Sequence, residues 1–250
     1  MPSFKSDDVA IHFVDEGPRD GEPVLLVHGF ASSIRFNWTD PGWIETLTEA
    51  GYRTIAFDHR GHGSSDKPKD EAAYTPHKMA ADAFRLLDHL DIPAASFFGY
   101  SMGARVSAFA ALDRPDRVTR LVLGGLGYGL IEGVGDWDPI ARALRAPSLD
   151  EVSDPRGQMF RAFADRTKSD REALAACIAH SRDEITEAEA RSILTPTLIG
   201  VGSRDDIAGS PDRLAEIMPN ARALTIANRD HMLAVGDKTF KTAVLGFLAS

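Results

Sequence analysis

Cysteine is almost absent from the sequence: Cys177 is the only one among 250 residues, so no disulfide can form within the chain. A chain without disulfides fits a reducing compartment. The first residues also lack the apolar stretch of a signal peptide, and no run of about eighteen apolar residues occurs that could cross a membrane. These absences predict a cytoplasmic protein with no membrane partner.

Positively charged side chains are fewer than negatively charged ones. The chain has 28 lysines and arginines against 37 aspartates and glutamates, a formal net charge of −9. Nucleic acids and anionic membranes favour basic surfaces, so neither is expected as a partner. Clustered cysteines and histidines at zinc spacing are missing, as is the phosphate-binding pattern G-x-x-x-x-G-K-[ST]. The sequence therefore predicts no metal ion and no organic cofactor.

What the sequence does contain is a series of short, continuous apolar runs. Runs of strand length that are apolar at consecutive positions are typical of strands buried on both faces of a parallel sheet. Helical patterns separate them, as in the apolar spacing that follows the N-cap candidate Thr75. This alternation predicts an α/β fold with a mostly parallel sheet and helices on both faces. The runs are 24–27, 54–57, 96–100, 121–123, 198–201 and 224–226.

The alternation of strands and helices stops between residues 126 and 193. This stretch contains no convincing strand, but Ser169 and Thr186 are N-cap candidates, each followed three residues later by a glutamate. We therefore expect a helical cap over 126–193, inserted into a core formed by residues 1–125 and 194–250.

The pentapeptide Gly99-Tyr100-Ser101-Met102-Gly103 follows one apolar run and precedes a helix rich in small residues. It fits the pattern G-x-S-x-G, in which a serine is held on a sharp strand-to-helix turn. The residues two before and two after such a serine are crowded, so both should be glycine, as here. In an alternative interpretation the glycines only form a turn and the serine caps the helix. The flanking strand and helix favour a nucleophile, Ser101.

A serine hydroxyl is a weak nucleophile until a base takes its proton. Of the eight histidines, His231 is the best placed, because it follows the last apolar run and precedes the final helix. Its orienting carboxylate is expected just after the run at 198–201, where Asp205 and Asp206 are adjacent. The residues alone leave both aspartates open.

Two backbone N–H groups are predicted to hold the oxyanion of an acyl-transfer reaction. One belongs to Met102, directly after the serine, and the other to Phe30, in the loop after the first long apolar run. The neighbouring His28 is expected to brace this loop rather than to act as a second base.

Aromatic residues are the candidates for an apolar substrate pocket. Each could instead pack between the cap and the sheet, and we expect that for about half of them. The five candidates are Trp38, Tyr128, Trp137, Phe160 and Phe163.

Together with the segments 58–65 and 202–205, these landmarks resemble, in their order along the chain, those of the α/β-hydrolase superfamily. The resemblance covers all of the chain except the expected cap. It implies an eight-stranded, mostly parallel sheet under a helical cap, and it favours Asp205 over Asp206 as the triad acid.

The chain order Ser101, Asp205, His231 is the one expected of this fold. Relatives that act as haloalkane dehalogenases or epoxide hydrolases carry an aspartate where this chain has Ser101, so their chemistry is not expected here. The elbow is similar to those of carboxylesterases, enol-lactone hydrolases and carbon–carbon bond hydrolases.

The function expected from the sequence is hydrolysis of carboxylic esters with small to medium, mainly apolar acyl groups, through an acyl-enzyme on Ser101. The partner is then a small-molecule ester, and the protein a monomer or homodimer. The same triad would serve a lactonase or a carbon–carbon bond hydrolase, if Arg142, Arg145 or Arg161 pointed at a substrate carboxylate. A third alternative is a ligand-sensing receptor with a hydrolase-like fold.

Overall fold

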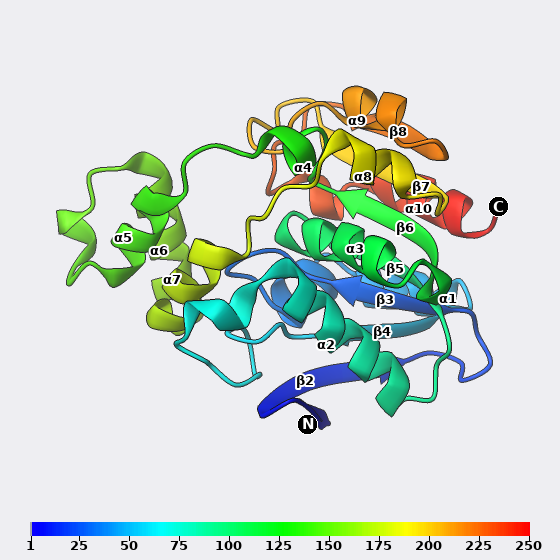
Figure 1. The fold of residues 1–250 in the computed structure, drawn as a ribbon, viewed down its shortest axis with the longest axis horizontal. Helices are drawn as coiled ribbons and strands as arrows, with labels where there is room; N and C mark the ends of the chain where they lie inside the picture. Colours follow the sequence, from blue (N-terminus) through cyan, green and yellow to red (C-terminus); the bar gives the residue numbers. More distant parts are fainter. Residues whose placement is uncertain (1) are drawn as a thin grey trace.

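In the computed structural model, which describes residues 2–250, eight strands form one sheet in the order β1-β2-β4-β3-β5-β6-β7-β8 (Figure 1). β2 is antiparallel to both of its neighbours, and the other seven strands run in the same direction as one another. The mostly parallel, eight-stranded sheet is thus confirmed. The strands are β1 (Ser3–Ser6), β2 (Val9–Glu16), β3 (Pro23–Val27), β4 (Arg53–Phe57), β5 (Ala95–Tyr100), β6 (Val118–Gly124), β7 (Thr197–Gly202) and β8 (Ala221–Ile226).

Helices connect the parallel strands and end the chain. α2 shows why they start where they do: the side chain of Thr75 accepts a hydrogen bond from the N–H of Lys78, and Pro76 occupies the first helical position. No helix in residues 2–250 combines the length and the apolar character needed to cross a membrane. The helices are α1 (Trp43–Glu49), α2 (Pro76–His89), α3 (Met102–Asp113), α4 (Gly129–Glu132), α5 (Asp138–Arg145), α6 (Pro155–Thr167), α7 (Arg171–His180), α8 (Glu187–Ser192), α9 (Pro211–Ile217) and α10 (Lys238–Leu248).

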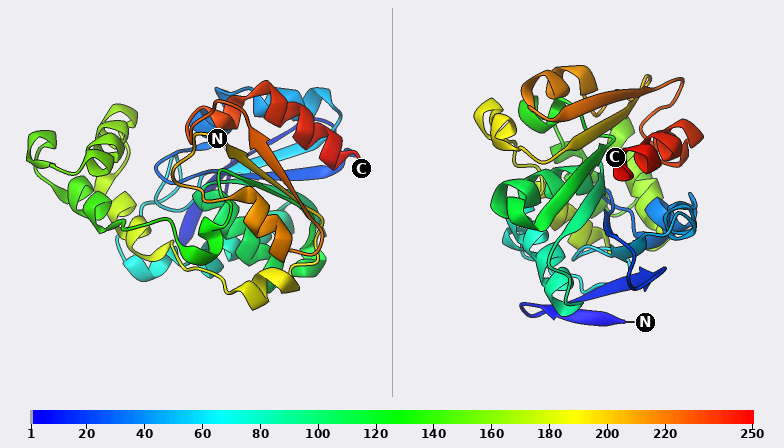
Figure 2. Two further views of the ribbon diagram at one scale, coloured as in Figure 1. Left: turned by 90° about the horizontal axis from the view of Figure 1, so that it is seen from above. Right: turned by 90° about the vertical axis from the view of Figure 1, so that its right-hand side faces the viewer.

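The central strands separate two apolar cores. In β3, Leu25 and Val27 face the core shared with α2, α3 and α9, whereas Val24 and Leu26 face the core shared with α1 and α10. The end-on view in Figure 2 shows α1 and α10 on one side of the sheet and α2 and α3 on the other. Because both faces of these strands are buried, consecutive residues must be apolar, which explains the continuous runs in the sequence.

The chain between β6 and β7 forms five helices, α4 to α8, and no strand within the described residues. Figures 1 and 2 show α5 and α6 standing apart from the layered core, with α7 between them and the core. We call these three the cap helices. α4 and α8 instead lie beside the core: the N–H of Gly127 donates to the carbonyl of Ala208, and α8 packs against α9. The stretch 126–193 thus includes the cap helices and two segments that lie against the core.

In this stretch, the N-cap of one helix lies one residue away from the expected position. The side chain that caps α7 is Asp170 rather than Ser169, and it accepts from the N–H of Ala173. At α8 the expected capping box is present, with Thr186 and Glu189 bonded to each other's backbone N–H. Aspartate competes with serine as an N-cap on nearly equal terms, so adjacent Ser and Asp leave the start of the helix open by one residue.

Candidate active site

Three loops at the carboxyl edge of the sheet bring the expected triad residues together. Ser101 follows β5 directly, Asp205 lies three residues after β7, and His231 lies in the loop between β8 and α10. Ligands of open α/β sheets bind at this edge, because the loops that leave parallel strands converge there. Residues more than a hundred positions apart are thereby placed side by side.

A chain of two hydrogen bonds links the three side chains. His231 Nε2 lies 2.9 Å from Ser101 Oγ, and His231 Nδ1 lies 2.8 Å from Asp205 Oδ2. The Asp205 side chain is fully buried, and its other oxygen accepts from the N–H groups of Ile207 and Ala208. A carboxylate fixed in this way can only accept, so it favours a proton on Nδ1 and leaves Nε2 free to take the serine proton.

Asp206, the other candidate acid, is exposed, and its neighbour occupies the position facing His231. The geometry therefore distinguishes two aspartates that the residues alone leave open. Tyr100 adds a further link, since its hydroxyl donates to the backbone carbonyl of His231 at 2.7 Å. Burial, and next the charge of Asp205, raise the pKa of Tyr100 well above its usual value, so the phenol stays a donor.

The turn that holds Ser101 has the crowded geometry expected from G-x-S-x-G. Ser101 has φ 55° and ψ −116°, a conformation that residues other than glycine rarely adopt. A Cβ on Gly103 would lie 1.9 Å from the carbonyl oxygen of Val27, and one on Gly99 would lie 2.2 Å from the carbonyl oxygen of Gly103. Both glycines are therefore required by contact with the backbone.

The loop after β3 lies against Ser101 and carries the second expected oxyanion donor. A Cβ on Gly29 would lie 3.3 Å from Cβ of Ser101, so the loop that carries Phe30 lies against the serine. Met102 is the first residue of α3, and its N–H has no acceptor within the helix. The side chain of Asn37 accepts from the N–H of Gly29 at 2.8 Å and so fixes this loop.

Asn37 is a residue that sequence reasoning missed. It lies in a π-helical turn, Arg35–Thr39, and is buried. Its contact with Gly29 depends on how this turn folds back over the end of β3. No motif marks it, since asparagine eight residues after a glycine is not a recognisable pattern.

The His28 side chain braces the same loop, as expected. Its Nδ1 lies 2.8 Å from the carbonyl of Gly29, and its Nε2 accepts from the N–H of His59 at 3.0 Å. The ring is fully buried, and this burial lowers its pKa, so it is a neutral histidine with a proton on Nδ1. Both nitrogens are occupied, and neither contacts Ser101.

Beside Ser101 and His231 lies an apolar cavity of about 530 Å³, which we call the outer cavity. Three of the five aromatic candidates line it, namely Trp137, Phe160 and Phe163. The Phe160 ring packs on both Phe30 and Trp137, with ring centroids 5.5 and 5.9 Å apart. The cap helices thus supply much of the apolar wall opposite the serine.

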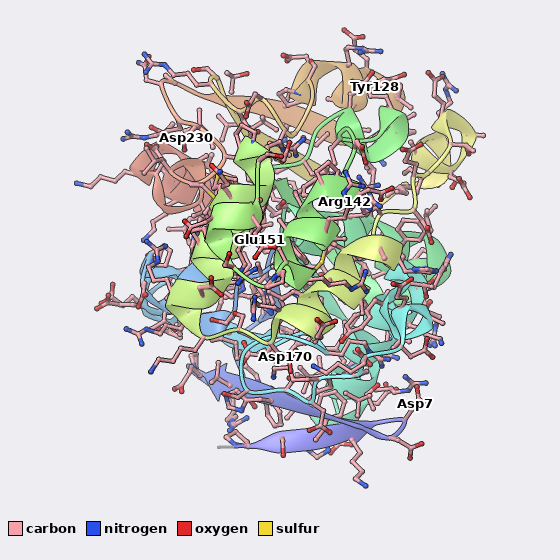
Figure 3. All side chains as sticks on the ribbon, turned by 90° about the vertical axis from the view of Figure 1, so that its left-hand side faces the viewer. Asp7, Tyr128, Arg142, Glu151, Asp170 and Asp230 are labelled. Atoms are coloured by element: carbon pink, nitrogen blue, oxygen red, sulfur yellow. The ribbon has the colours of Figure 1, made fainter. Side chains whose placement is uncertain are left out.

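Trp38 and Tyr128 do not line this cavity, so for these two the expectation is wrong. Trp38 is fully buried in the core shared with α1 and α10, and its ring centroid lies 4.9 Å from that of Phe98. The Tyr128 hydroxyl donates to Glu187 at 3.1 Å, and its ring lies under the Arg213 guanidinium. Figure 3 shows Tyr128 beside the core helices, away from the cap helices. Aromatic character alone does not tell a cavity wall from a packed core.

The three cap arginines considered as carboxylate ligands point elsewhere. Arg161 donates to the carbonyls of Ala143 and Ala146, Arg145 pairs with Glu71, and Arg142 is exposed on α5 (Figure 3). None of the three lines a cavity next to Ser101. Within residues 2–250, no group of three or more His, Cys, Asp or Glu side chains is arranged to hold a metal ion.

Curated relatives resemble part of the chain. It is 31% identical over 152 residues to a haloalkane dehalogenase of Psychrobacter cryohalolentis, which covers 56% of this chain and 47% of that protein. It is 41% identical over 113 residues to a putative carbamate hydrolase of Variovorax paradoxus, covering 45% of this chain and 41% of that protein. The matches thus span less than half the length of these two relatives.

Solved structures resemble the whole chain. A hydrolase from Pseudomonas aeruginosa superimposes with a TM-score of 0.84 at 26% identity, covering 100% of this chain and 98% of that one. The enol-lactonase from Burkholderia xenovorans gives a TM-score of 0.81 at 22% identity, with both chains covered completely. The family model for the alpha/beta hydrolase fold matches residues 22–178, which is more than half of the sequence. The chain therefore belongs to the α/β-hydrolase family.

Proposed function

We propose that this hydrolase cleaves carboxylic esters through an acyl-enzyme on Ser101. The observation that carries the proposal is the hydrogen-bonded chain from Asp205 through His231 to Ser101, which ends at an apolar cavity. A nucleophile, a base and an orienting carboxylate at these distances are the parts that acyl transfer needs.

Acylation begins when Ser101 Oγ attacks the ester carbonyl carbon while His231 Nε2 takes its proton. The N–H groups of Phe30 and Met102 hold the negative oxygen of the tetrahedral intermediate, and the N-terminus of α3 adds a favourable dipole. The carbon–oxygen bond of the ester then breaks, and the alcohol leaves with the proton from His231. Asp205 stabilises the imidazolium that exists between the two proton transfers.

Deacylation repeats these steps with water in place of the serine. His231 takes a proton from water as the hydroxyl attacks the acyl-enzyme carbonyl. The second tetrahedral intermediate collapses, Ser101 leaves with the proton from His231, and the acid is released. A lactone, being an internal ester, would follow the same steps and release a single hydroxy acid.

The outer cavity supports a substrate with a sizeable apolar part. Its volume of about 530 Å³ lies in the range of pockets that bind small organic molecules. Its walls are mainly aromatic and aliphatic, and Arg166 is the one cation among the lining residues that the structure describes. A neutral apolar group is therefore the expected occupant.

The relatives named above are named for different reactions, so the choice between these reactions rests on the residues of this chain. A dehalogenase of this family is expected to carry an aspartate at the elbow, and this chain carries Ser101. The serine favours acyl transfer over displacement of a halide.

The test is hydrolysis of a series of p-nitrophenyl esters by the wild type and by Ser101→Ala. We expect turnover in the wild type and a loss of several orders of magnitude in the variant. A fluorophosphonate probe should add to the wild-type chain at Ser101, as located by peptide mass spectrometry. A folded wild type that neither turns over an ester nor reacts with the probe would refute the proposal.

A further inference from the structure

A second, much smaller cavity lies next to Ser101, and we call it the inner cavity. Its volume is about 30 Å³, far below that of the outer cavity, so it suits a short group rather than a bulky one. Phe30, Ser101 and Trp137 line both cavities, so these three residues separate one from the other. Most of the remaining wall comes from α3, from the end of α7 and from the loop after β6, and Val134 and Ile207 complete it.

Three residues that line the inner cavity carry buried hydrogen-bond donors that have no partner among the described residues. They are the hydroxyl of Ser181, Nε of Arg182 and Nε1 of Trp137. Ser181 and Trp137 are 2% and 7% exposed. A buried polar group without a hydrogen bond costs about 1–3 kcal/mol. Three such groups around one small space therefore indicate a ligand that offers acceptor oxygens.

The two charged residues that line this space are both arginines, Arg105 and Arg182. Arg105 forms part of the wall, and three backbone carbonyls hold its guanidinium at 2.8 to 3.4 Å. Burial lowers the pKa of Arg105 to about 10, so it remains a cation at neutral pH. Arg182 contacts Asp138 at 3.2 Å through its terminal nitrogen, and its Nε is left over.

No aspartate or glutamate is among the described residues that line the inner cavity. Asp183 and Glu184 act on Arg105 from outside the lining. An anionic group of the ligand would therefore meet two guanidinium groups and no carboxylate in the wall. Carboxylate oxygens accept from such groups in strong, charge-assisted hydrogen bonds.

The two cavities also differ in which part of the catalytic machinery they contain. His231 lines only the outer cavity, and Met102, an expected oxyanion donor, lines only the inner one. The leaving alcohol must be within reach of His231, which gives it a proton. The alcohol therefore belongs in the outer cavity, and the acyl chain beyond the scissile carbonyl belongs in the inner one.

We propose that the substrate is an ester of a short dicarboxylic acid, with an apolar alcohol in the outer cavity. The free carboxylate of the acid lies in the inner cavity against Ser181, Arg182 and Trp137. This inference rests on the proposed function and refines it, because the apolar part of the substrate becomes the alcohol rather than the acyl group. Hydrolysis with one water then gives a dicarboxylate and an apolar alcohol.

The experiment compares benzyl hydrogen succinate with its neutral isostere, benzyl 4-methylpentanoate, by measuring the benzyl alcohol released. The wild type is expected to prefer the succinate monoester in kcat/KM by at least about tenfold. Arg182→Met should lower kcat/KM for this substrate about 10- to 100-fold, the loss typical of a hydrogen bond to a charged group, and Ser181→Ala about tenfold. The neutral isostere should change less than about threefold in either variant.

Arg166→Met is the matched control, because it removes a guanidinium from the outer cavity and leaves the inner one intact. If this variant abolishes the preference and Arg182→Met does not, the carboxylate binds in the outer cavity and the proposal is wrong. A wild type that prefers the neutral isostere also overturns it, while leaving ester hydrolysis through Ser101 intact.

Binding separates failure of the proposed function from failure of this inference. Ser101→Ala should bind benzyl hydrogen succinate in calorimetry, and Ser101→Ala combined with Arg182→Met should bind it about 10- to 100-fold more weakly. If no ester is hydrolysed but this difference in binding is found, the proposed function fails and the inner cavity remains a carboxylate site. Equal binding by the two proteins, or none, overturns the inference whatever the turnover.

Discussion

Asp205 Oδ2 lies 2.8 Å from His231 Nδ1, whereas the adjacent Asp206 is exposed. The difference arises because the turn after β7 ends with two backbone N–H groups donating to Asp205 Oδ1, which fixes this carboxylate inside the loop. Two neighbouring residues of the same type therefore have different surroundings, and a pair of variants can compare them directly.

Asp205→Asn should lower kcat for ester hydrolysis by about 10⁴-fold, the size of effect known for the same change in serine-protease triads, because the amide favours the wrong histidine tautomer. Asp206→Asn should stay within about threefold of the wild type, since a surface change away from the site has little effect. Initial rates at saturating substrate measure both. Damage confined to Asp206→Asn would assign the acid to the other aspartate.

Asn37→Ala should lower kcat about tenfold with little change in KM. The side chain of Asn37 accepts from the N–H of Gly29 and so fixes the loop. A looser loop should weaken the oxyanion hole less than the outright loss of a donor, which costs about 10²–10³-fold. Inhibition by a phenylboronic acid should weaken in parallel, because the boronate resembles the tetrahedral intermediate. Ser32→Ala, at another polar position of the outer cavity, is the control. A rise in KM alone would show that Asn37 only contacts substrate.

Local patterns predicted what depends on neighbours in sequence. The six apolar runs became β3 to β8. In the central strands, burial on both faces forces consecutive positions to be apolar. The elbow at Ser101 could also be predicted, because its steric crowding involves only five consecutive residues. The N-cap of α7 could not be predicted to the residue: it is Asp170, where Ser169 was expected.

Contacts between distant segments could not be predicted in the same way. Trp38 and Phe160 are both aromatic residues in helical turns, yet one packs under the sheet and the other faces the outer cavity. The inner cavity exists because the end of α7 meets α3, about 75 residues earlier, and Ser181 and Arg182 carry no motif. Three of the five aromatic candidates line the outer cavity, and chemistry of the side chain alone does not select them.

Gly103→Ala should destabilise the protein by several kcal/mol, because its Cβ would lie 1.9 Å from the backbone carbonyl oxygen of Val27, which cannot move without shifting β3. Gly246→Ala is the matched control within α10, where nothing lies within 4 Å of the added Cβ. There the change should stabilise by about 0.5–1 kcal/mol, since alanine is the better helix former. Urea unfolding gives both free energies. A stable Gly103→Ala protein would contradict the crowding at the elbow.

The stability of the fold should fall as the pH drops from about 6.5 to 4.5. His28, His59 and His62 are fully buried beside one another, with ring centroids 4.7 to 6.2 Å apart. Burial lowers the pKa of all three, and that of His62 to about 3. Below pH 6.5 the unfolded chain binds protons that the folded chain does not. His62, whose pKa is lowered to about 3, therefore contributes a loss of about 1.4 kcal/mol per pH unit, and His28 and His59 act in the same direction.

His62→Phe keeps a ring in place and removes one titrating group, so the slope of unfolding free energy against pH should become shallower by about 1.4 kcal/mol per pH unit. His180→Gln, at an exposed position on α7, should leave the slope unchanged. Urea unfolding at half-unit steps between pH 7 and 4.5 measures it. Asp and Glu begin to take up protons at the acidic end of this window, so the histidine contribution is the difference in slope between the variant and the wild type. An unchanged slope in His62→Phe would mean that His62 accepts its proton in the folded protein, and that its burial is relieved before unfolding begins.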